Sequence, residues 1–487
     1  MEFLEIFVLI FSFIVLLVIG VPIAFSIGIS GILTMLVSID MIPALTTFSQ
    51  RMATGLDSFA LLAIPFFILA GNIMNSGGIA IRLIDFARVL VGGIPGGVAI
   101  VNVLANMLFG AISGSAAASA SAIGSIMGPE MKKEGYADNF SAAVNITSAT
   151  TGLSIPPSNI LIVYSLASGG VSITALFLAG YVPGILTGLG IIITAVTMLI
   201  YKRKGTAAAV KALGIALLIG AALVLAFQGI SMARATFNPT VNRILLILFI
   251  VAFGIFGFIK TKNNKAKALE GSKKLLDAIP SLLMLIIVIG GIVAGYFTAT
   301  EASAIAVLYS VILAFIYRQV SFSDLPLIIL RSVKTTGIVL LLVATCLGLS
   351  WIMAYENIPQ NVSEGLLSVS SNPFIILLLI NLILLFVGVF MDMTPAVLIF
   401  TPIFLPIVTA MGVDPIHFGI IMVLNLSVGL CTPPVGSVLF IGCSVAGLSI
   451  DKVIKPLIPM FLAMVVVLLL VTYLPQLSLW LPGKFGF

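Results

Sequence analysis

The stretch GLSIPPS at residues 152–158 returns 277 residues later as GLCTPPV at residues 429–435. Both copies place a glycine and a Pro-Pro pair inside otherwise apolar sequence, and the same spacing pairs Gly135 with Gly412. Helix breakers at matching places in two halves of a membrane protein indicate a binding site between two structural repeats. The duplication therefore predicts a chain that moves a solute across a membrane.

The composition restricts the chain to a lipid bilayer. Hydrophobic residues make up 61% of the 487 residues and charged residues only 8%, with a mean hydropathy of +1.29. A soluble domain carries roughly 25% charged residues, and a spanning helix needs about 20 apolar residues. We expect an all-α polytopic membrane protein. The net charge of +6 indicates membrane orientation and gives no reason to expect a nucleic-acid partner.

The 277-residue shift divides the chain into a first repeat at 1–204, a connector at 205–281 and a second repeat at 282–487. The connector contains apolar stretches at 212–230 and 242–259, which predict two additional transmembrane helices. Basic residues cluster near both of its ends, which predicts that these ends are cytoplasmic. The clusters comprise Lys202, Arg203, Lys204, Lys211, Lys260, Lys262, Lys265, Lys267, Lys273 and Lys274.

Each repeat contains interrupted rather than continuous passes. Two apolar runs flank Ser-Gly-Ser in the first half, and their combined length of about 30 residues suits a re-entrant hairpin better than two full spans. We predict hairpin tips at 113–115 and 391–394, and broken helices at 140–168 and 417–447. Non-helical backbone at membrane depth is tolerated only inside protein or beside water, so the tips and breaks are expected to meet.

The Pro-Pro pairs remove consecutive amide donors and leave carbonyl oxygens free to hold a cation. Hydroxyl groups in the breaks and tips add hard oxygen ligands of the kind that small cations prefer. A pair of purely structural kinks is the alternative, and the repetition favours the cation site. These hydroxyls belong to Ser113, Ser115, Ser154, Ser158, Thr394 and Thr432.

Asp392 is the carboxylate expected at membrane depth, because apolar runs lie on both sides of it. An acid inside a membrane segment is costly and therefore a functional candidate. It could bind a cation, orient a loop or carry a proton, and the alternative is that it only caps the helix near Pro395.

Asparagine side chains near the breaks are candidate substrate contacts, although hydrogen bonding between helices is their commoner role. The candidate substrate-binding residues are Asn145, Ser158, Asn159 and Asn425. HExxH, GxSxG and phosphate-loop motifs are absent from the sequence, so we expect a protein that is not an enzyme and needs no cofactor. A membrane-embedded enzyme using Asp392 and a passive channel are the rival classes.

Six motifs together resemble the large membrane subunit of tripartite ATP-independent periplasmic (TRAP) transporters. The likeness runs through both halves in the same order, which makes it more specific than any single motif. The motifs are FGAISGS (109–115), GPEMKKEGY (128–136), IPPSNILIVY (155–164), FTATEASA (297–304), FMDMTPA with TPIFLP (390–406) and GLCTPPVG (429–436).

The resemblance implies an elevator-type transporter of the bacterial inner (cytoplasmic) membrane with two inverted repeats. It also implies sodium as the coupling ion and the only metal. It implies import of a small organic acid such as a C4-dicarboxylate or a sialic acid. A four-helix membrane subunit and a periplasmic binding protein would be its partners. One sodium site is implied at Ser113, Gly114, Ser115 and the backbone from Ser154 to Pro156; the other is implied at Met391, Asp392, Thr394 and the backbone around Cys431 and Thr432.

The chain departs from the family pattern at two motifs. An acidic residue follows the Ser-Gly-Ser tip in many members, whereas Ala116 stands here, and the family's first proline in FTPTEA is Ala299. The runner-up interpretation is a sodium- or proton-driven dicarboxylate carrier of related fold that works without a binding protein.

Overall fold

The computed structural model describes residues 2–93, 96–208, 210–211, 213–214, 265–433 and 435–487. Within these ranges every regular element is a helix. Eight of the described helices are long and apolar enough to cross a membrane. The prediction of an all-α polytopic membrane protein is therefore confirmed. Most of the two predicted connector helices lies outside the described residues.

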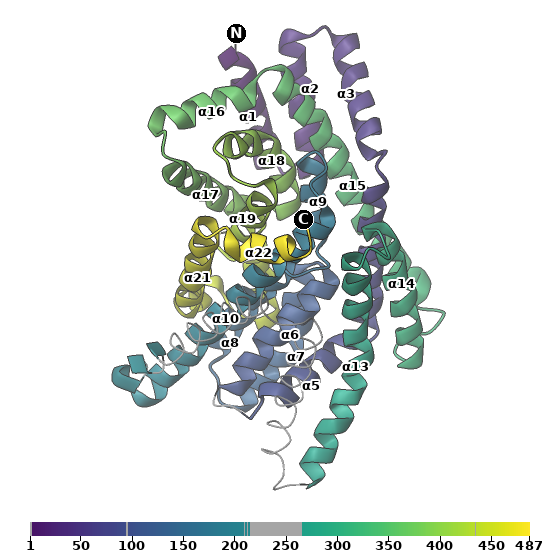
Figure 1. Cartoon of the computed structure of the whole chain (residues 1–487), viewed down its shortest axis with the longest axis vertical. Helices are drawn as coiled ribbons and strands as arrows, with labels where there is room; N and C mark the ends of the chain where they lie inside the picture. Colours follow the sequence, from purple (N-terminus) through teal and green to yellow (C-terminus); the bar gives the residue numbers. More distant parts are fainter. Residues whose placement is uncertain (1, 94–95, 209, 212, 215–264, 434) are drawn as a thin grey trace.

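The described helices of the first half run from the N-terminus to the start of the connector (Figure 1). They are α1 (Glu2–Val18), α2 (Ile23–Ser38), α3 (Met41–Leu56), η1 (Phe59–Leu62), α4 (Ala63–Ser76), α5 (Ile79–Val91), α6 (Gly97–Ser113), α7 (Ala116–Lys133), α8 (Asp138–Ala149), η2 (Thr151–Leu153), α9 (Asn159–Ala167) and α10 (Ile173–Lys204).

The predicted boundary between the connector and the second repeat, at residues 281 and 282, lies within the long helix α13. The helices are α13 (Lys265–Val293), α14 (Ala299–Ile316), α15 (Leu325–Tyr355), α16 (Ile358–Val369), α17 (Pro373–Phe390), α18 (Met393–Ala410), α19 (Pro415–Gly429), α20 (Ser437–Ala446), α21 (Ile450–Tyr473) and α22 (Gln476–Lys484).

Helix boundaries in the two halves coincide under the 277-residue shift. Both ends of α7, 116 and 133, map onto 393 and 410, which are the ends of α18. The first residues of α8 and α10 likewise map onto the first residues of α19 and α21. The two halves thus divide into helices at the same places, whereas the inverted orientation of the repeats stays a prediction.

Short turns separate the two helices of each hairpin. Helix α6 ends at Ser113 because Gly114 adopts a left-handed conformation with φ of 62°, and the Ser115 hydroxyl then caps α7 by accepting from the Ala118 amide at 3.2 Å. In the second hairpin Met391 and Asp392 are extended between α17 and α18. The second turn is shorter than the predicted 391–394, because Thr394 already belongs to α18.

The helices that follow each hairpin are interrupted at the Pro-Pro sequences. Residues 154–158 separate η2 from α9, and residues 430–436 separate α19 from α20. Pro156, Pro157 and Pro433 cannot donate backbone hydrogen bonds, so a regular helix cannot continue through them. Non-helical backbone therefore lies between two buried helical segments in both halves.

Glycines let each hairpin approach the break of its own half. A Cβ atom on Gly152 would lie 2.5 Å from the Cα of Gly110, and one on Gly429 would lie 2.7 Å from the Cα of Gly388. Since real Cβ atoms do not approach backbone so closely, only glycine permits this packing. The first helix of each hairpin is thereby held directly against the segment where the neighbouring helix breaks.

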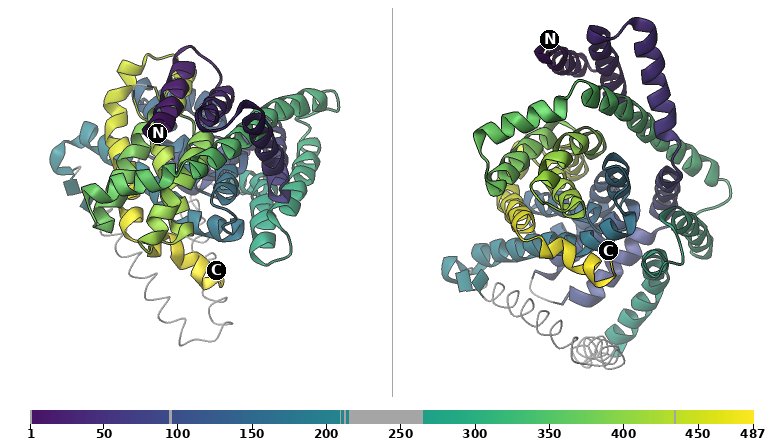
Figure 2. Two further views of the ribbon diagram at one scale, coloured as in Figure 1. Left: turned by 90° about the horizontal axis from the view of Figure 1, so that it is seen from above. Right: turned by 45° about the horizontal axis from the view of Figure 1, so that its top comes forward.

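The remaining long helices flank this core on one side. Helix α4 packs along α14, and α15 packs along α2 and α3. Figures 1 and 2 show α2, α3, α13, α14 and α15 as an arc beside the compact group that contains α6–α10 and α17–α21. We call the helices α2, α3, α4, α14 and α15 the flanking helices.

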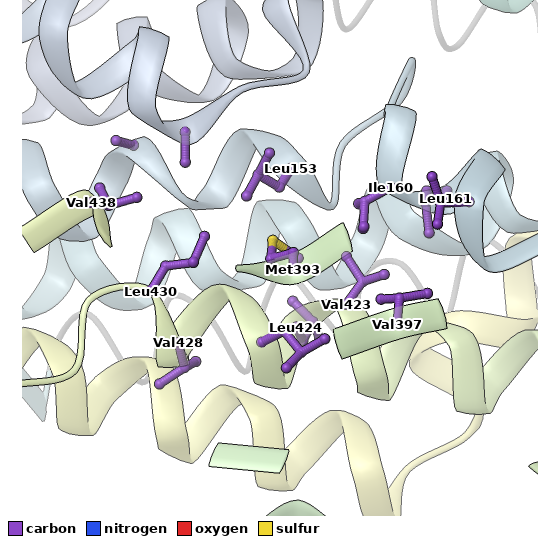
Figure 3. Packing of buried hydrophobic residues seen from close by; sticks show 14 of the residues in the cluster. Leu153, Ile160, Leu161, Met393, Val397, Val423, Leu424, Val428, Leu430 and Val438 are labelled. Carbon is purple, nitrogen blue, oxygen red and sulfur yellow. The ribbon is translucent and has the colours of Figure 1, made fainter. Parts of the chain in front are cut away.

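Apolar side chains from both halves interdigitate between the breaks. Figure 3 shows Leu153 and Ile160 of the first half close to Met393, Val423 and Leu430 of the second half. All five belong to one buried cluster. Close packing here fixes the two breaks relative to each other.

Replacing Gly429 by Ala tests the close helix contact. The added methyl group must displace backbone atoms of Gly388, and we expect a loss of about 1–3 kcal/mol in stability from overpacking. Thermal unfolding of the purified protein in detergent measures this loss. The control is Gly337→Ala, where no atom lies within 4 Å of the new methyl group. Equal unfolding temperatures for the two variants would contradict the proposed packing constraint.

Candidate functional site

The two hairpin turns and residues at the edges of the two breaks line one cavity of about 280 Å³. Residues 113–118 contribute from the first hairpin and residues 392–394 from the second. Leu153, the last residue before the first break, and its equivalent Leu430 in the second half line it as well. Segments separated by hundreds of residues thus form the walls of a single chamber inside the protein.

The first turn presents hydroxyl and backbone groups to the cavity. The Ser113 hydroxyl lies 3.4 Å from both the carbonyl oxygen and the amide nitrogen of Ser115, so these contacts are at the long end of the hydrogen-bond range. Asn159 packs directly over this turn, because a Cβ on Gly114 would lie 2.7 Å from the Asn159 amide nitrogen. The carbonyl oxygen of the Asn159 side chain is buried and receives no hydrogen bond within the described residues.

The second turn contributes Asp392, whose side chain is exposed to the cavity. It occupies the position before the first turn of α18 but makes no side-chain capping hydrogen bond. Its carboxylate forms none of the ion pairs found in the described residues. Simple helix capping therefore does not account for this residue, and Asp392 is the only charged side chain among those that line the chamber.

The predicted ligands in the first break lie just behind the cavity wall. Ser154 is buried, and its hydroxyl oxygen has no hydrogen-bond partner in the described part of the chain. Its backbone carbonyl faces α10, where a Cβ on Gly180 would lie 2.1 Å from the oxygen. The Ser158 hydroxyl donates to the Leu153 carbonyl. Neither these two serines nor Pro156 lines the chamber.

The predicted ligands in the second break are also displaced from the cavity surface. The Cys431 thiol is buried between the halves and donates to the Ile146 carbonyl at 3.4 Å. The Thr432 hydroxyl donates to the Val428 carbonyl at 3.0 Å. Together with Met391, both side chains lie outside the chamber lining, whereas Thr394 is part of it.

Two of the four substrate candidates are bonded inside the helix bundle. Asn106 donates to the side-chain oxygens of Asn145 at 3.0 Å and Ser148 at 2.9 Å, and accepts from Ser119 at 2.8 Å. Asn145 also donates to the Ala120 carbonyl, and Asn425 donates to the Asn381 side chain at 2.7 Å. Of the predicted substrate-binding residues, the structure places Asn159 at the cavity and the other three away from it.

The flanking helices supply a wall that the sequence analysis missed. Asn72 and Asn75 of α4 and Thr335 of α15 line the same chamber. Asn72 and Asn75 lie three residues apart and thus on one face of a helix, which is a detectable signal in an apolar segment. Gly71 also brings α4 against the first turn, since a Cβ there would lie 3.1 Å from the Ser113 carbonyl oxygen.

Comparison with known proteins gives the family. The model of the "Tripartite ATP-independent periplasmic transporter, DctM component" matches residues 10–477. The chain belongs to this family. It is therefore a permease subunit of a TRAP transporter rather than an enzyme, and a multi-pass protein of the inner membrane. The resemblance inferred from the sequence motifs is confirmed.

Similar proteins extend along the whole chain. The "Uncharacterized protein YgiK" of Salmonella typhimurium is 52% identical, over 99% of this chain and 98% of that protein. The "C4-dicarboxylate TRAP transporter large permease protein DctM" of Pseudomonas aeruginosa is 38% identical, over 95% of this chain and 94% of that protein. The solved YdaH transporter of Alcanivorax borkumensis matches with a TM-score of 0.58 at 13% identity, over 92% of this chain and 90% of that one, which shows a shared fold alone.

Two substitutions separate structural from functional polar groups. Asn106→Ala leaves several buried groups without partners, and we expect it to cost about 1–3 kcal/mol of stability. Asp392→Asn removes no ion pair, so we expect it to lower the stability by only about 0.3–1 kcal/mol, the interaction of the carboxylate with the helix dipole. Thermal unfolding in detergent compares the two variants. Destabilisation by Asp392→Asn equal to that of Asn106→Ala would show that Asp392 is a structural residue.

Proposed function

We propose that this TRAP permease imports a small organic acid, such as a C4-dicarboxylate or a sialic acid, together with sodium ions. The observation that carries the proposal is the shared cavity, which is lined by the Asp392 carboxylate, unpaired within the described residues, and by several hydroxyl-bearing side chains. Sodium prefers hard oxygen ligands, and the cavity walls offer them on both hairpin turns. The name of the Pseudomonas relative supports a carboxylate as the transported solute.

The charge balance of the cavity supports coupling to a cation. Asp392 carries a negative charge, and the lining residues include no lysine, arginine or histidine. A second carboxylate ~6 Å away would be repelled by roughly 3 kcal/mol at an effective dielectric constant of 20. A sodium ion beside Asp392 removes this repulsion, so the ion and the organic acid bind more favourably together than separately.

The ligand sets follow the two hairpins. The first ion would be held by Ser113, Gly114, Ser115 and the backbone from Ser154 to Pro156. Ser154 and Asn159 support a ligand here because each has a buried oxygen that receives no hydrogen bond within the described residues. Such orphaned oxygens cost free energy unless a bound group supplies the missing interaction.

The second ion would be held by Asp392, Thr394, the backbone of Met391 and the backbone around Cys431 and Thr432. The organic acid would lie between the two ion sites and contact Asn159. Movement of the hairpins and breaks past the flanking helices would then carry the solute across the membrane. The tripartite family supports a small four-helix membrane subunit and a periplasmic binding protein as partners.

Gradient-driven uptake by Asp392→Asn tests the coupling. We expect at least a tenfold loss of sodium-driven uptake, because an ion ligand worth ~1.4 kcal/mol or more is lost. The assay uses membrane vesicles containing the permease with its co-expressed small subunit and binding protein, and labelled succinate or N-acetylneuraminate as the probe. The control is Glu364→Gln on α16, an exposed acid that does not line the cavity.

Three results would overturn the proposal. Uptake by wild-type vesicles that is the same with and without a sodium gradient excludes sodium coupling. Normal sodium-driven uptake by Asp392→Asn excludes its role as an ion ligand. Wild-type vesicles that accumulate neither acid, although all components are present, exclude small carboxylates of these two kinds.

A further inference from the structure

The cavity has a wall that belongs to neither hairpin and neither break. On α4, the residues Ile64, Ile68, Gly71, Asn72 and Asn75 recur at helical spacing and all face the chamber. The wall is apolar at Ile64 and Ile68 and becomes polar at Asn72 and Asn75. Two amides therefore lie at one end of a stripe that is otherwise suited to packing.

A hydrogen-bond chain fixes the orientation of one of these amides. The Asn72 side-chain nitrogen donates to the Ser332 hydroxyl of α15 at 2.8 Å, and that hydroxyl donates to the Ile328 carbonyl at 2.8 Å. The bond to Ser332 uses only one of the two N–H groups of the Asn72 amide. The other N–H group and the amide oxygen make no hydrogen bond within the described residues. The amide is thus held in place by the flanking helices with hydrogen-bonding capacity to spare.

Asn75 has fewer hydrogen-bond partners than Asn72 within the described residues. Its side chain is exposed and makes no hydrogen bond in the described ranges. It is the second-last residue of the candidate membrane span Phe59–Ser76, and it lines the chamber. Helix packing does not require an amide at this position.

An anion in this chamber has no cationic side chain to bind. The lining residues carry the single negative charge of Asp392 and otherwise only neutral groups. A carboxylate must therefore be held by N–H and O–H donors, and it is repelled from the side of Asp392. The unused N–H groups of Asn72 and Asn75 lie on a different wall, formed by α4.

We propose that Asn72 and Asn75 bind a carboxylate group of the transported acid inside the permease. This inference rests on the proposed transport of a carboxylate. It divides the cavity into two functional walls. The hairpin turns hold the coupling ions, and the asparagine wall, defined by Asn72 and Asn75 on α4, adds hydrogen-bond donors to the acid in this conformation and releases it when the hairpins move past α4.

The test separates the apparent affinity for the acid from the dependence on sodium. We expect Asn75→Ala to raise the KM for succinate about tenfold, the effect of losing one hydrogen bond to a charged group. Asn75→Asp is expected to raise it further, because a second negative charge repels the acid. In both variants, at a saturating succinate concentration, the sodium concentration that gives half-maximal uptake stays at the wild-type value, because coupled binding then no longer depends on the affinity for the acid. Uptake is measured in vesicles with the complete transporter.

Two further variants control for structural effects. Asn361→Ala on α16 removes an asparagine that does not line the cavity, and its KM for succinate is expected to equal that of the wild type. Ser332→Ala keeps Asn72 but removes the hydroxyl that orients it, so a smaller rise in KM is expected. Thermal unfolding in detergent is expected to give the wild-type midpoint for Asn75→Ala, because the Asn75 side chain makes no hydrogen bond within the described residues.

The outcomes distinguish this inference from the proposed function. An unchanged KM for succinate in both Asn75 variants, with normal wild-type uptake, overturns the inference and leaves carboxylate transport intact. A shift in the sodium requirement without a shift in KM assigns the asparagine wall to an ion site and also overturns it. Wild-type vesicles that take up no carboxylate overturn the proposed function and this inference together.

Discussion

Non-helical backbone inside an apolar protein must find partners, and this constraint organises the centre of the molecule. Helices α8 and α19 are followed by chain breaks at Pro-Pro sequences, where the regular hydrogen-bond ladder stops. Glycine pairs bring each hairpin to within backbone contact of its own break. Because the breaks cannot face lipid, the two halves pack with both breaks and both turns inward. The cavity follows from this arrangement.

Polar groups in the interior fall into two kinds. The network around Asn106 is fully hydrogen-bonded and joins α6, α7 and α8 into one unit. By contrast, the side-chain oxygens of Asn159 and Ser154 are buried without partners in the described residues. A buried unsatisfied group costs about 1–3 kcal/mol, so the second kind is best explained by a ligand that restores the missing interactions. The satisfied network stabilises the fold, whereas the unsatisfied Asn159 oxygen lies at the chamber and the Ser154 hydroxyl lies just behind its wall.

The chain breaks could be predicted from the sequence because proline and glycine act on their own backbone. The hydrogen-bond partners of Asn145 and Asn425 could not be predicted, although both residues are close to a break in the sequence. Their side chains point to neighbouring helices, and the direction depends on helix rotation and packing. His417 shows the same dependence on packing, since it is buried at the start of α19 and hydrogen-bonded to Ser478 of α22. Asn72 and Asn75 were not predicted because α4 carries neither a Pro-Pro pair nor a Ser-Gly-Ser turn, the motifs that mark the other walls of the chamber.

The single negative charge in the cavity couples the binding of the cation and the binding of the acid in both directions. If a bound cation favours the organic acid by neutralising Asp392, the acid must favour the cation by the same factor, because coupling between two binding equilibria is symmetric. A coupling of roughly 3 kcal/mol corresponds to more than a hundredfold change in affinity. Partial loading is then rare, and the chamber is either empty or filled with both solutes. Such all-or-none loading is what a secondary transporter needs in order to avoid dissipating its ion gradient, and here it would arise from one carboxylate placed where no basic side chain can balance it.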